Sequence, residues 1–495
     1  MRTVPRVAIN STMRTVPFLR SSRFFSTTIY PSKAPRIAVV GSGPAGFYSA
    51  QYVLKHINGS CVDMFEKYPV PFGLVRFGVA PDHPEVKNVI HSFSTTAKCP
   101  EFRFFGGVTI GSTLTVAELL QQYHAVVLAS GASRDRLLDI PGEDGFGVYS
   151  ARNIVGWYNG LPDDASFQPD FSHSSAVIVG QGNVAVDVAR ILLTSPDALS
   201  KTDITEYALE ALRRSRVRNI FLVGRRGPAQ VAFTIKEFRE LTKLPDVNII
   251  LNEVDVALIR NHLKEFPRQR KRLMELMVSC AGNVPSDTGK NCYLKFLASP
   301  RKIVRSDDRI EAVNFSVNRL RDPMDISSGV VSTDDVDIIK CGLVIRSIGY
   351  EAVPLCGSIP FDSAECIVPN DMGRVDQMPG LYCSGWIKRG PVGVILTTMN
   401  DAYETVDTLM EDIQSGRLNL SDKIRDPTQI LELLRSRQCD PVSFEEWEKI
   451  DREEERIGKL SGKPREKIVS VRAMLGIAKD MKFVENDAAK DTVAI

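Results

Sequence analysis

The feature that most constrains the fold is a glycine-rich turn placed between an apolar strand and a helical stretch. Residues 37–40 are all apolar and lead directly into GSGPAG, in which Gly41, Gly43 and Gly46 have the G-x-G-x-x-G spacing. In this pattern the first glycine permits the tight turn, the second lets a pyrophosphate approach the backbone, and the third lets the helix lie close to the strand. The sequence therefore predicts a βαβ unit that binds a dinucleotide.

The residues after this turn support the same interpretation. Apolar residues recur every three or four positions over residues 47–57, as in a helix packed on a sheet. A second apolar stretch, residues 61–65, ends on Glu66, whose carboxylate could bind the ribose hydroxyls of the nucleotide. The alternative is an ordinary glycine turn in an α/β domain, which the combination of strand, helix and acid disfavours.

Composition limits the class of protein. A chain of 495 residues with 43% hydrophobic and 25% charged residues is long enough for two or three soluble domains. No stretch approaches the roughly 18 apolar residues of a membrane-spanning helix. The net charge of +2 does not indicate a nucleic-acid binder. The nine cysteines form no C-x-x-C pair, so we expect neither a redox dithiol nor a metal site.

The first 33 residues have the composition of a mitochondrial transit peptide. The first acidic residue of the chain is Asp63, whereas arginines are mixed with many serines and threonines before it. This segment lacks the continuous apolar core of a secretory signal. We expect residues 1–33 to be a targeting sequence, and the alternative is an unstructured tail. The sequence MRTVP occurs at both Met1 and Met13, so either methionine could be the start.

A second glycine turn differs from the first in the charge beside it. An apolar strand opens into GQGNVA, in which Gly180, Gly182 and Ala185 have the G-x-G-x-x-A spacing. The next apolar strand is followed by Arg225 and Arg226 instead of a carboxylate. Arginines can bind a 2′-phosphate that an acidic residue would repel. This second unit is therefore predicted to bind NADP in preference to NAD.

Two basic clusters occur in the same half of the chain. They comprise Arg213, Arg214, Arg216 and Arg218 in the first cluster, and Arg268, Arg270, Lys271 and Arg272 in the second. Such clusters can be solvated faces or docking surfaces for an acidic protein. Because no aromatic residues are interleaved with them, nucleic-acid binding is disfavoured.

Three further segments carry expectations. His83, in a proline-rich loop, could titrate near a redox centre, or it could simply be a loop histidine with structural partners. A third glycine turn ends at Gly393 and leads into a long helix, whose positive end would stabilise negative charge on a reduced flavin. Beyond Asp440 apolar residues are sparse, so we expect this segment to wrap the surface without contributing to a core. Residues 481–495 are expected to be a disordered tail.

Several long motifs resemble one known family. They are VPFGLVRFGVAPDHPEVKN from Val70, GQGNVAVDVARILL from Gly180, LVGRRGPAQVAFTIKE from Leu222, LYCSGWIKRGPVGVI from Leu381 and GKPREK from Gly462. With these motifs the sequence resembles the adrenodoxin reductases, which are mitochondrial NADPH-dependent ferredoxin reductases. The resemblance covers about Lys33 to Leu475.

The resemblance implies an α/β fold with two Rossmann-like dinucleotide-binding domains, the NADP domain being inserted into the FAD domain. The implied FAD domain comprises residues 34–134 and 347–480, and the NADP domain comprises residues 135–346. Beside the first glycine turn, the family's FAD positions fall on Ala45, Glu66, Leu74, Val108, Trp386, Gly393, Val394 and Ile395. Its NADP positions fall on Gln181, Gly182, Asn183, Val184, Arg225, Arg226, Glu237 and again Gly393. Most related two-domain flavoenzymes have Asp where this chain has Trp386.

The resemblance also implies a reaction and a partner. NADPH would reduce FAD by hydride transfer, and single electrons would pass to a two-iron two-sulfur ferredoxin. The ferredoxin would dock on a basic face of the NADP domain, comprising Arg213, Arg214, Arg268, Arg270, Lys271 and Arg272. The implied location is the mitochondrial matrix, with a peripheral contact at the inner membrane left open. No catalytic residue, oligomer or nucleic-acid partner is implied.

Three alternatives to this function differ in what they require. A disulfide reductase of the thioredoxin reductase type needs a redox-active cysteine pair, and the nucleotide-binding half of a glutamate synthase needs cysteine-rich motifs. The sequence contains neither pattern. A flavin-binding scaffold without turnover stays open, although glycine patterns in both units argue against it.

Overall fold

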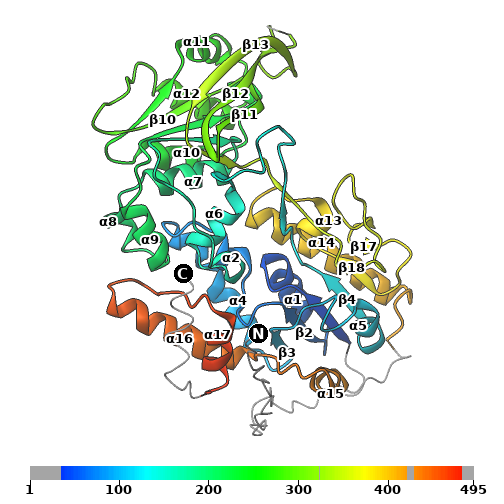
Figure 1. Ribbon diagram of the computed structural model, residues 1–495. Helices are drawn as coiled ribbons and strands as arrows, with labels where there is room; N and C mark the ends of the chain where they lie inside the picture. Colours follow the sequence, from blue (N-terminus) through cyan, green and yellow to red (C-terminus); the bar gives the residue numbers. More distant parts are fainter. Residues whose placement is uncertain (1–34, 323, 421–427, 482–495) are drawn as a thin grey trace, which may run out of the picture.

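The computed structural model describes residues 35–322, 324–420 and 428–481 (Figure 1). The expected targeting sequence, residues 1–33, lies outside the described residues, as does the expected tail beyond Met481. Within the described part of the chain, no helix combines the length and the apolar character needed to cross a membrane.

The first domain contains a seven-stranded sheet with the order β16-β17-β18-β4-β1-β2-β3. In chain order these strands are β1 (Arg36–Val40), β2 (Cys61–Glu66), β3 (Phe102–Gly106), β4 (Ala125–Leu128), β16 (Asn370–Asp371), β17 (Arg374–Val375) and β18 (Leu381–Cys383). Strands β18, β4, β1, β2 and β3 are parallel to one another, whereas β16 and β17 form an antiparallel edge next to β18. Because both faces of the parallel part are covered, its strands are almost entirely apolar and buried.

Successive residues of β1 point to opposite faces of this sheet, and each face has its own layer of helices. Ile37 and Val39 pack with α1, α4, α14, α16 and α17, whereas Ala38 and Val40 pack with α5 and α15. The helices of this domain are α1 (Pro44–His56), α2 (Leu74–Phe77), α3 (Pro84–Lys87), α4 (Val89–Ala97), α5 (Val116–Gln122), α13 (Trp386–Arg389), α14 (Ile395–Gln414), α15 (Gln429–Ser436), α16 (Phe444–Leu460) and α17 (Val471–Ala478).

The second domain contains a six-stranded parallel sheet with the order β6-β14-β7-β8-β10-β9. Its strands are β6 (Val148–Ser150), β7 (Ser175–Val179), β8 (Asn219–Val223), β9 (Val247–Leu251), β10 (Lys290–Lys295) and β14 (Leu343–Arg346). One face is covered by α6 (Ala151–Tyr158), α7 (Asn183–Leu193), α9 (Glu206–Arg213), α10 (Ile235–Thr242), α11 (Glu253–His262) and α12 (Arg268–Val278), with α8 (Pro196–Leu199) before α9. The other face is covered by an antiparallel sheet of β11 (Ala298–Ser306), β12 (Arg309–Leu320) and β13 (Val330–Lys340). Two short 3-10 helices, η1 (Pro162–Asp164) and η2 (Pro228–Gln230), complete the domain.

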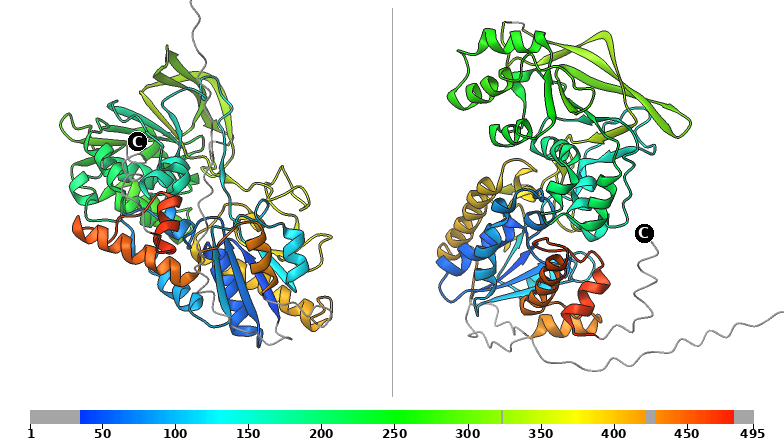
Figure 2. Two further views of the ribbon diagram at one scale, coloured as in Figure 1. Left: turned by 60° about the horizontal axis from the view of Figure 1, so that its bottom comes forward. Right: turned by 90° about the vertical axis from the view of Figure 1, so that its left-hand side faces the viewer.

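The second domain is inserted into the first. Strands β4 and β18 are hydrogen-bonded neighbours, although every strand of the second sheet lies between them in the chain. The chain leaves the first domain through β5 (Arg134–Asp135) and returns through β15 (Tyr350–Glu351), and these two strands pair with each other. Figures 1 and 2 show the two domains as separate lobes. The predicted fold class is thereby confirmed.

The expectation that the segment beyond Asp440 contributes nothing to a core was wrong. Phe444, Trp447 and Ile450 of α16 are buried in the core of the first domain, and the Trp447 ring lies edge-on to Phe72 at 6.1 Å. These apolar residues recur every three positions and so form one narrow stripe along the helix. A stripe of this kind is easily overlooked because the other faces of α16 are highly charged.

Candidate cofactor sites

The first glycine turn has the geometry that the spacing predicted. A methyl group on Gly41 would lie 2.5 Å from the carbonyl oxygen of Ala129, and one on Gly46 would lie 2.0 Å from that of Gly41. Gly41 also has a φ of +104°, which side-chain-bearing residues rarely adopt. A methyl group on Gly43, by contrast, would have no other atom within 4 Å. The outer glycines therefore serve close packing, and the middle one leaves room for a pyrophosphate at the start of α1.

Glu66 lies beside this turn at the end of β2. Its carboxylate accepts hydrogen bonds from the backbone N–H of Ser42 at 3.0 Å and from the Ser42 hydroxyl at 2.7 Å. The buried Val108 donates its backbone N–H to the carbonyl of Glu66 at 2.8 Å. Sequence reasoning missed Ser42, although a hydroxyl inside the glycine turn was a usable signal.

Two distant segments meet the start of α1 near Gly43. A methyl group on Gly73 would lie 2.9 Å from the Cα of Gly43, and this approach brings Leu74 to the turn with 45% of its surface exposed. From the other end of the chain, a methyl group on Gly385 would lie 2.6 Å from the Cβ of Ala45. The residue after Gly385 is Trp386, which stacks on Tyr350 at 5.7 Å.

The third glycine turn completes this convergence. Gly393 has a φ of +90°, and Val394 caps the N-terminus of α14, which begins at Ile395 and packs along α1. Val394 is 53% exposed at this helix start, and its neighbours Val392 and Leu396 are exposed as well. The predicted FAD residues are therefore brought together from three parts of the chain, and the glycine cradle and apolar rim suit a flavin nucleotide.

The second glycine turn also combines a closely packed first glycine with an open middle glycine. A methyl group on Gly180 would lie 2.1 Å from the carbonyl oxygen of Ser347, whereas nothing lies within 4 Å of that position on Gly182. Ala185 is buried under the first turn of α7, where a larger side chain would not fit. This turn, too, has open space only at its middle glycine.

Two predicted NADP residues direct their side chains into the protein. Gln181 donates its side-chain amide to the carbonyls of Leu222 at 3.1 Å and Lys295 at 2.8 Å. The side-chain oxygen of Asn183 accepts the backbone N–H of Thr234 at 2.8 Å. Both side chains thus hold the turn in shape. Because the Gln181 carbonyl also accepts the backbone N–H groups of Ala232 and Phe233 at 3.0 Å, its backbone N–H is the part left for a ligand. The next residue, Val184, is half-buried.

Arg225 and Arg226 are exposed at the end of β8 and line a pocket of about 350 Å³. Its other wall comes from the antiparallel sheet and includes Ser299, Asn318 and Ser332. Asn318 donates its side-chain amide to the carbonyl of Arg225 at 2.7 Å and to the hydroxyl of Ser299 at 2.8 Å. Two cations among hydroxyl and amide groups suit a phosphate. Sequence reasoning missed this second wall because it is far away in the chain.

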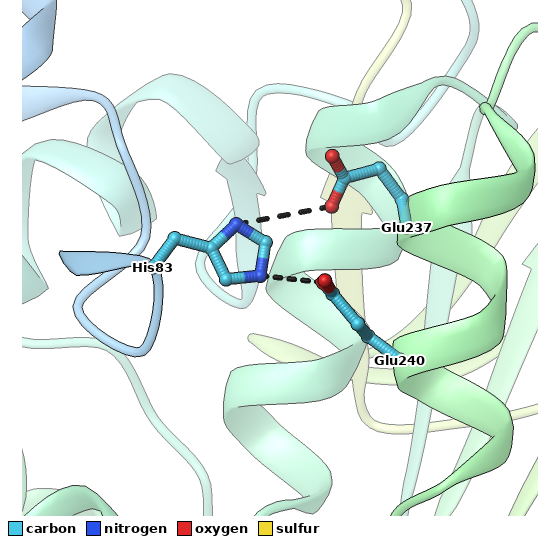
Figure 3. A group of neighbouring side chains, drawn as sticks. All are labelled: His83, Glu237 and Glu240. Carbon is cyan, nitrogen blue, oxygen red and sulfur yellow. Dashed lines mark ion pairs between the residues drawn. The ribbon is translucent and has the colours of Figure 1, made fainter. Parts of the chain in front are cut away.

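Glu237 lies in an ionic cluster between the two domains (Figure 3). His83 of the first domain contacts the Glu240 carboxylate at 2.6 Å and that of Glu237 at 3.9 Å. Burial, together with the neighbouring Asp187 carboxylate, raises the pKa of Glu237 to about 7. These three side chains could hold a cation. However, the Arg190 guanidinium lies 3.7 Å from both glutamates and supplies that positive charge, so we assign no metal site.

The two basic clusters do not form one continuous face. Figure 1 shows α9 and α12 well apart on the second domain. Arg213 and Arg214, at the end of α9, pair with glutamates of the same helix at 3.0 and 3.8 Å. On α12, Arg268 and Arg272 are exposed, whereas Arg270 is half-buried and donates to a backbone carbonyl at 2.8 Å.

The cysteines are unsuited to disulfide chemistry. All nine are free. Burial raises the pKa of Cys61, Cys292, Cys341 and Cys383 to about 12, so these thiols stay protonated and unreactive near neutral pH. The structure therefore gives no support to the thioredoxin reductase alternative.

Comparisons with known proteins agree with this geometry. Residues 35–291 match the family model described as pyridine nucleotide-disulphide oxidoreductase. The mitochondrial NADPH:adrenodoxin oxidoreductase of Homo sapiens is 51% identical over 90% of this chain and 92% of its own length. The corresponding protein of Arabidopsis thaliana is 42% identical over 92% of this chain and 98% of its own length.

A solved structure shows the same fold. It is FprA of Mycobacterium tuberculosis in complex with NADPH, which is 39% identical and has a TM-score of 0.85 over 90% of this chain and 100% of its own. The glycine turns, the convergence of distant segments on α1 and these similarities lead to one conclusion. The chain belongs to the adrenodoxin reductase family of pyridine nucleotide-disulphide oxidoreductases.

Proposed function

We propose that this protein is an NADPH-dependent ferredoxin reductase that uses FAD. The observation that carries the proposal is the difference between the two glycine turns. The first lies beside the carboxylate of Glu66, whereas the second lies beside the cationic pocket of Arg225 and Arg226. One turn therefore suits a nucleotide with free ribose hydroxyls, and the other suits one with a 2′-phosphate. The relatives named above are NADPH-dependent oxidoreductases.

In the first domain the chain's own residues would hold FAD. The turn formed by Gly41, Gly43, Ala45 and Gly46 would hold the pyrophosphate in the open space at Gly43, and Glu66 would bind the ribose. The remaining contacts would come from Leu74, Val108, Trp386, Gly393, Val394 and Ile395. When bound, the flavin accepts a hydride and releases electrons singly. The N-terminus of α14 would favour negative charge on a reduced ring placed beside Gly393.

In the second domain the chain would hold NADPH through the backbone of its glycine turn and the arginine pocket. The proposed residues are Gln181, Gly182, Asn183, Val184, Arg225, Arg226 and Glu237, with Gly393 shared between the two nucleotides. Because Glu237 lies at the domain boundary beside His83, the nicotinamide end would lie there, close to the flavin. The corresponding domain division is residues 34–134 and 347–480 for FAD, and 135–346 for NADP.

The electrons would leave to a two-iron two-sulfur ferredoxin. On α12 the exposed Arg268 and Arg272 and the half-buried Lys271 would attract an acidic partner. Arg213, Arg214 and Arg270 would add to the positive potential. The relatives are named mitochondrial. We therefore place the mature protein in the mitochondrial matrix after removal of residues 1–33, with a peripheral contact at the inner membrane as a further proposal.

Anaerobic titration of the FAD-loaded protein with NADPH tests this function. Flavin absorbance should bleach, and a mitochondrial-type ferredoxin should restore it, whereas a disulfide substrate should not. Absence of bleaching, or reoxidation by the disulfide alone, would contradict the proposal.

The arginine pocket is tested with Arg225→Ala/Arg226→Ala, which should raise the KM for NADPH by about tenfold or more and leave the KM for NADH nearly unchanged. Equal effects on both would mean that the arginines do not bind the phosphate.

A further inference from the structure

One short segment of the first domain presents charged and titratable side chains to the second domain. It is the sequence DHPEVK, residues 82–87, which lies in and around α3. Each of these side chains contacts an ionisable side chain of the second domain. The pairs are Asp82 with Arg190 at 2.6 Å, His83 with Glu240 at 2.6 Å, Glu85 with Lys236 at 3.0 Å, and Lys87 with Asp203 at 2.7 Å.

These four pairs differ greatly in burial. The Lys236 and Glu85 side chains are 50% and 55% exposed, so this pair contributes little to the free energy that holds the domains together. By contrast, the side chains of Lys87 and Asp203 are 13% and 12% exposed. The Lys87 ammonium lies 2.7 Å from both carboxylate oxygens of Asp203. This pair and the Asp82–Arg190 pair, in which the Arg190 side chain is 2% exposed, are therefore the ones that lose most if the domains separate.

Asp203 also binds a third segment, the GKPREK motif that carries part of the family resemblance. The Lys467 ammonium lies 3.2 Å from the Asp203 carboxylate and 3.3 Å from the side-chain oxygen of Asn159. The Lys467 side chain is only 1% exposed. Burial would by itself raise the pKa of Asp203, but Lys467 and Lys87 together hold this pKa below its ordinary value. One carboxylate thus contacts two buried lysines, and burial lowers the pKa of Lys467 to about 7.

The GKPREK motif is anchored on both domains. Toward the second domain, Glu466 accepts the backbone N–H of Glu206 at 2.9 Å. Toward the first domain, Glu466 donates its backbone N–H to the carbonyl of Glu454 of α16 at 2.9 Å, and the fully buried Glu454 side chain pairs with Arg76. The motif therefore ties the C-terminal helices of the first domain to the loop that precedes α9. Asp203 contacts both this motif, through Lys467, and residues 82–87, through Lys87.

We infer that Asp203 is a positioning residue that, through Lys87 and Lys467, sets the orientation of the NADP-binding domain relative to the FAD-binding domain. The inference rests on the proposed function, because the two domains must bring a nicotinamide and a flavin into contact. Neither domain contains both nucleotide sites, so their distance depends on the contacts that hold one domain on the other. A misplacement of about 1 Å can slow a reaction by about a hundredfold.

The test compares Asp203→Asn with Asp197→Asn in the FAD-loaded protein. Asp197 lies exposed on α8, six positions earlier, and its substitution removes the same charge. Stopped-flow bleaching at saturating NADPH gives the rate of flavin reduction, and a spectroscopic titration gives the Kd of NADP⁺. Amide hydrogen exchange reports opening of residues 80–88 and 463–468. For Asp203→Asn we expect flavin reduction slowed by about tenfold or more, the Kd within about twofold, and faster exchange in both segments. Asp197→Asn should change none of these.

Several outcomes would overturn the inference. They are an unchanged rate of flavin reduction in Asp203→Asn, an equal loss in Asp197→Asn, or a loss confined to the Kd of NADP⁺. If Asp203→Asn does not fold, Lys87→Met keeps the Asp203–Lys467 pair and removes only the contact between residues 82–87 and Asp203. It should slow flavin reduction in the same direction, and an unchanged rate would again overturn the inference. Failure of the proposed function is distinguishable, since NADPH would then fail to bleach the unsubstituted protein.

Discussion

At the scale of single residues, each of the two glycine turns contains one kind of glycine that allows close packing and another that leaves room for a ligand. Gly41, Gly46 and Gly180 lie against backbone carbonyl oxygens, so that a methyl group on any of them would overlap an oxygen atom. Gly43 and Gly182 face open space. Substitutions at the two kinds of glycine should therefore have different consequences, although alanine is the smallest change available at both.

Gly46→Ala should disrupt the turn itself, because the added methyl would lie 2.0 Å from the Gly41 carbonyl oxygen. Overpacking of this kind costs about 1–3 kcal/mol of stability or more. We expect a lower melting temperature and loss of bound FAD. Gly43→Ala is the matched control. It should leave the melting temperature of the apoprotein unchanged and weaken FAD binding, as measured by flavin absorbance per protein. An equal fall in the melting temperature of the two apoprotein variants would contradict this assignment.

Glu237 should make stability depend on pH. Its pKa is raised from 4.5 to about 7 in the folded protein, chiefly by burial. Below pH 4.5 the carboxyl is protonated in both states, and the raised pKa favours the folded state. As the pH rises to about 7 this contribution is lost, because the unfolded chain ionises more readily. Glu237→Gln stays neutral throughout.

The variant should therefore melt close to the unsubstituted protein at pH 5 and a few degrees above it at pH 8. Differential scanning calorimetry of both proteins across this range checks the prediction. A difference in melting temperature that does not change with pH would show that Glu237 keeps an ordinary pKa.

At the scale of elements, α16 is a structural part of the first domain. Trp447 is 3% exposed, packs on Phe72 and lies under the Arg76 guanidinium, which is 5.0 Å from the ring centre. Because Arg76 also pairs with Glu454 of the same helix, charge and apolar contacts fix α16 at the same place. The position of α16 in turn fixes the GKPREK motif, which follows it in the chain.

Trp447→Ala should therefore destabilise the protein by about 3–5 kcal/mol, the usual cost of removing a large buried aromatic side chain. Urea unfolding of the FAD-loaded protein, followed by far-UV circular dichroism, measures this loss. Lys459→Ala, at an exposed position on the same helix, is the control and should have little effect. Similar losses in the two variants would mean that α16 is only a surface wrap.

At the scale of the whole molecule, the proposed docking of ferredoxin on α12 can be tested through the charge of that helix. Charge reversal of α12 with Arg268→Glu/Arg272→Glu should raise the KM for ferredoxin by about tenfold at low salt, and high salt should reduce the effect. Reduction of ferricyanide should not change. Arg213→Glu/Arg214→Glu on α9 is the matched comparison and should have a smaller effect, because these arginines already pair with glutamates. Steady-state kinetics with both acceptors would contradict the docking proposal if both rates fell together.

The extent to which sequence predicts this protein follows from the range of each interaction. The glycine turns were predictable because Gly41, Gly43 and Gly46 act on one another within a few positions. Arg225 was predictable as a cation at a strand end, but Asn318 behind it was not, since 93 positions separate them. The stripe of α16 was present in the sequence and was outweighed by the charges around it.

By itself the sequence determined the two dinucleotide-binding units, their preference for different nucleotides and the family. These properties depend on backbone conformation and on side chains close together in the chain. Only the tertiary structure decided how the units face each other. The Asp203 carboxylate meets Lys87 and Lys467 across 116 and 264 positions, and no periodicity links such residues. Their contact exists because two sheets, built from interleaved parts of one chain, bury these charges at the same boundary, where each needs a partner.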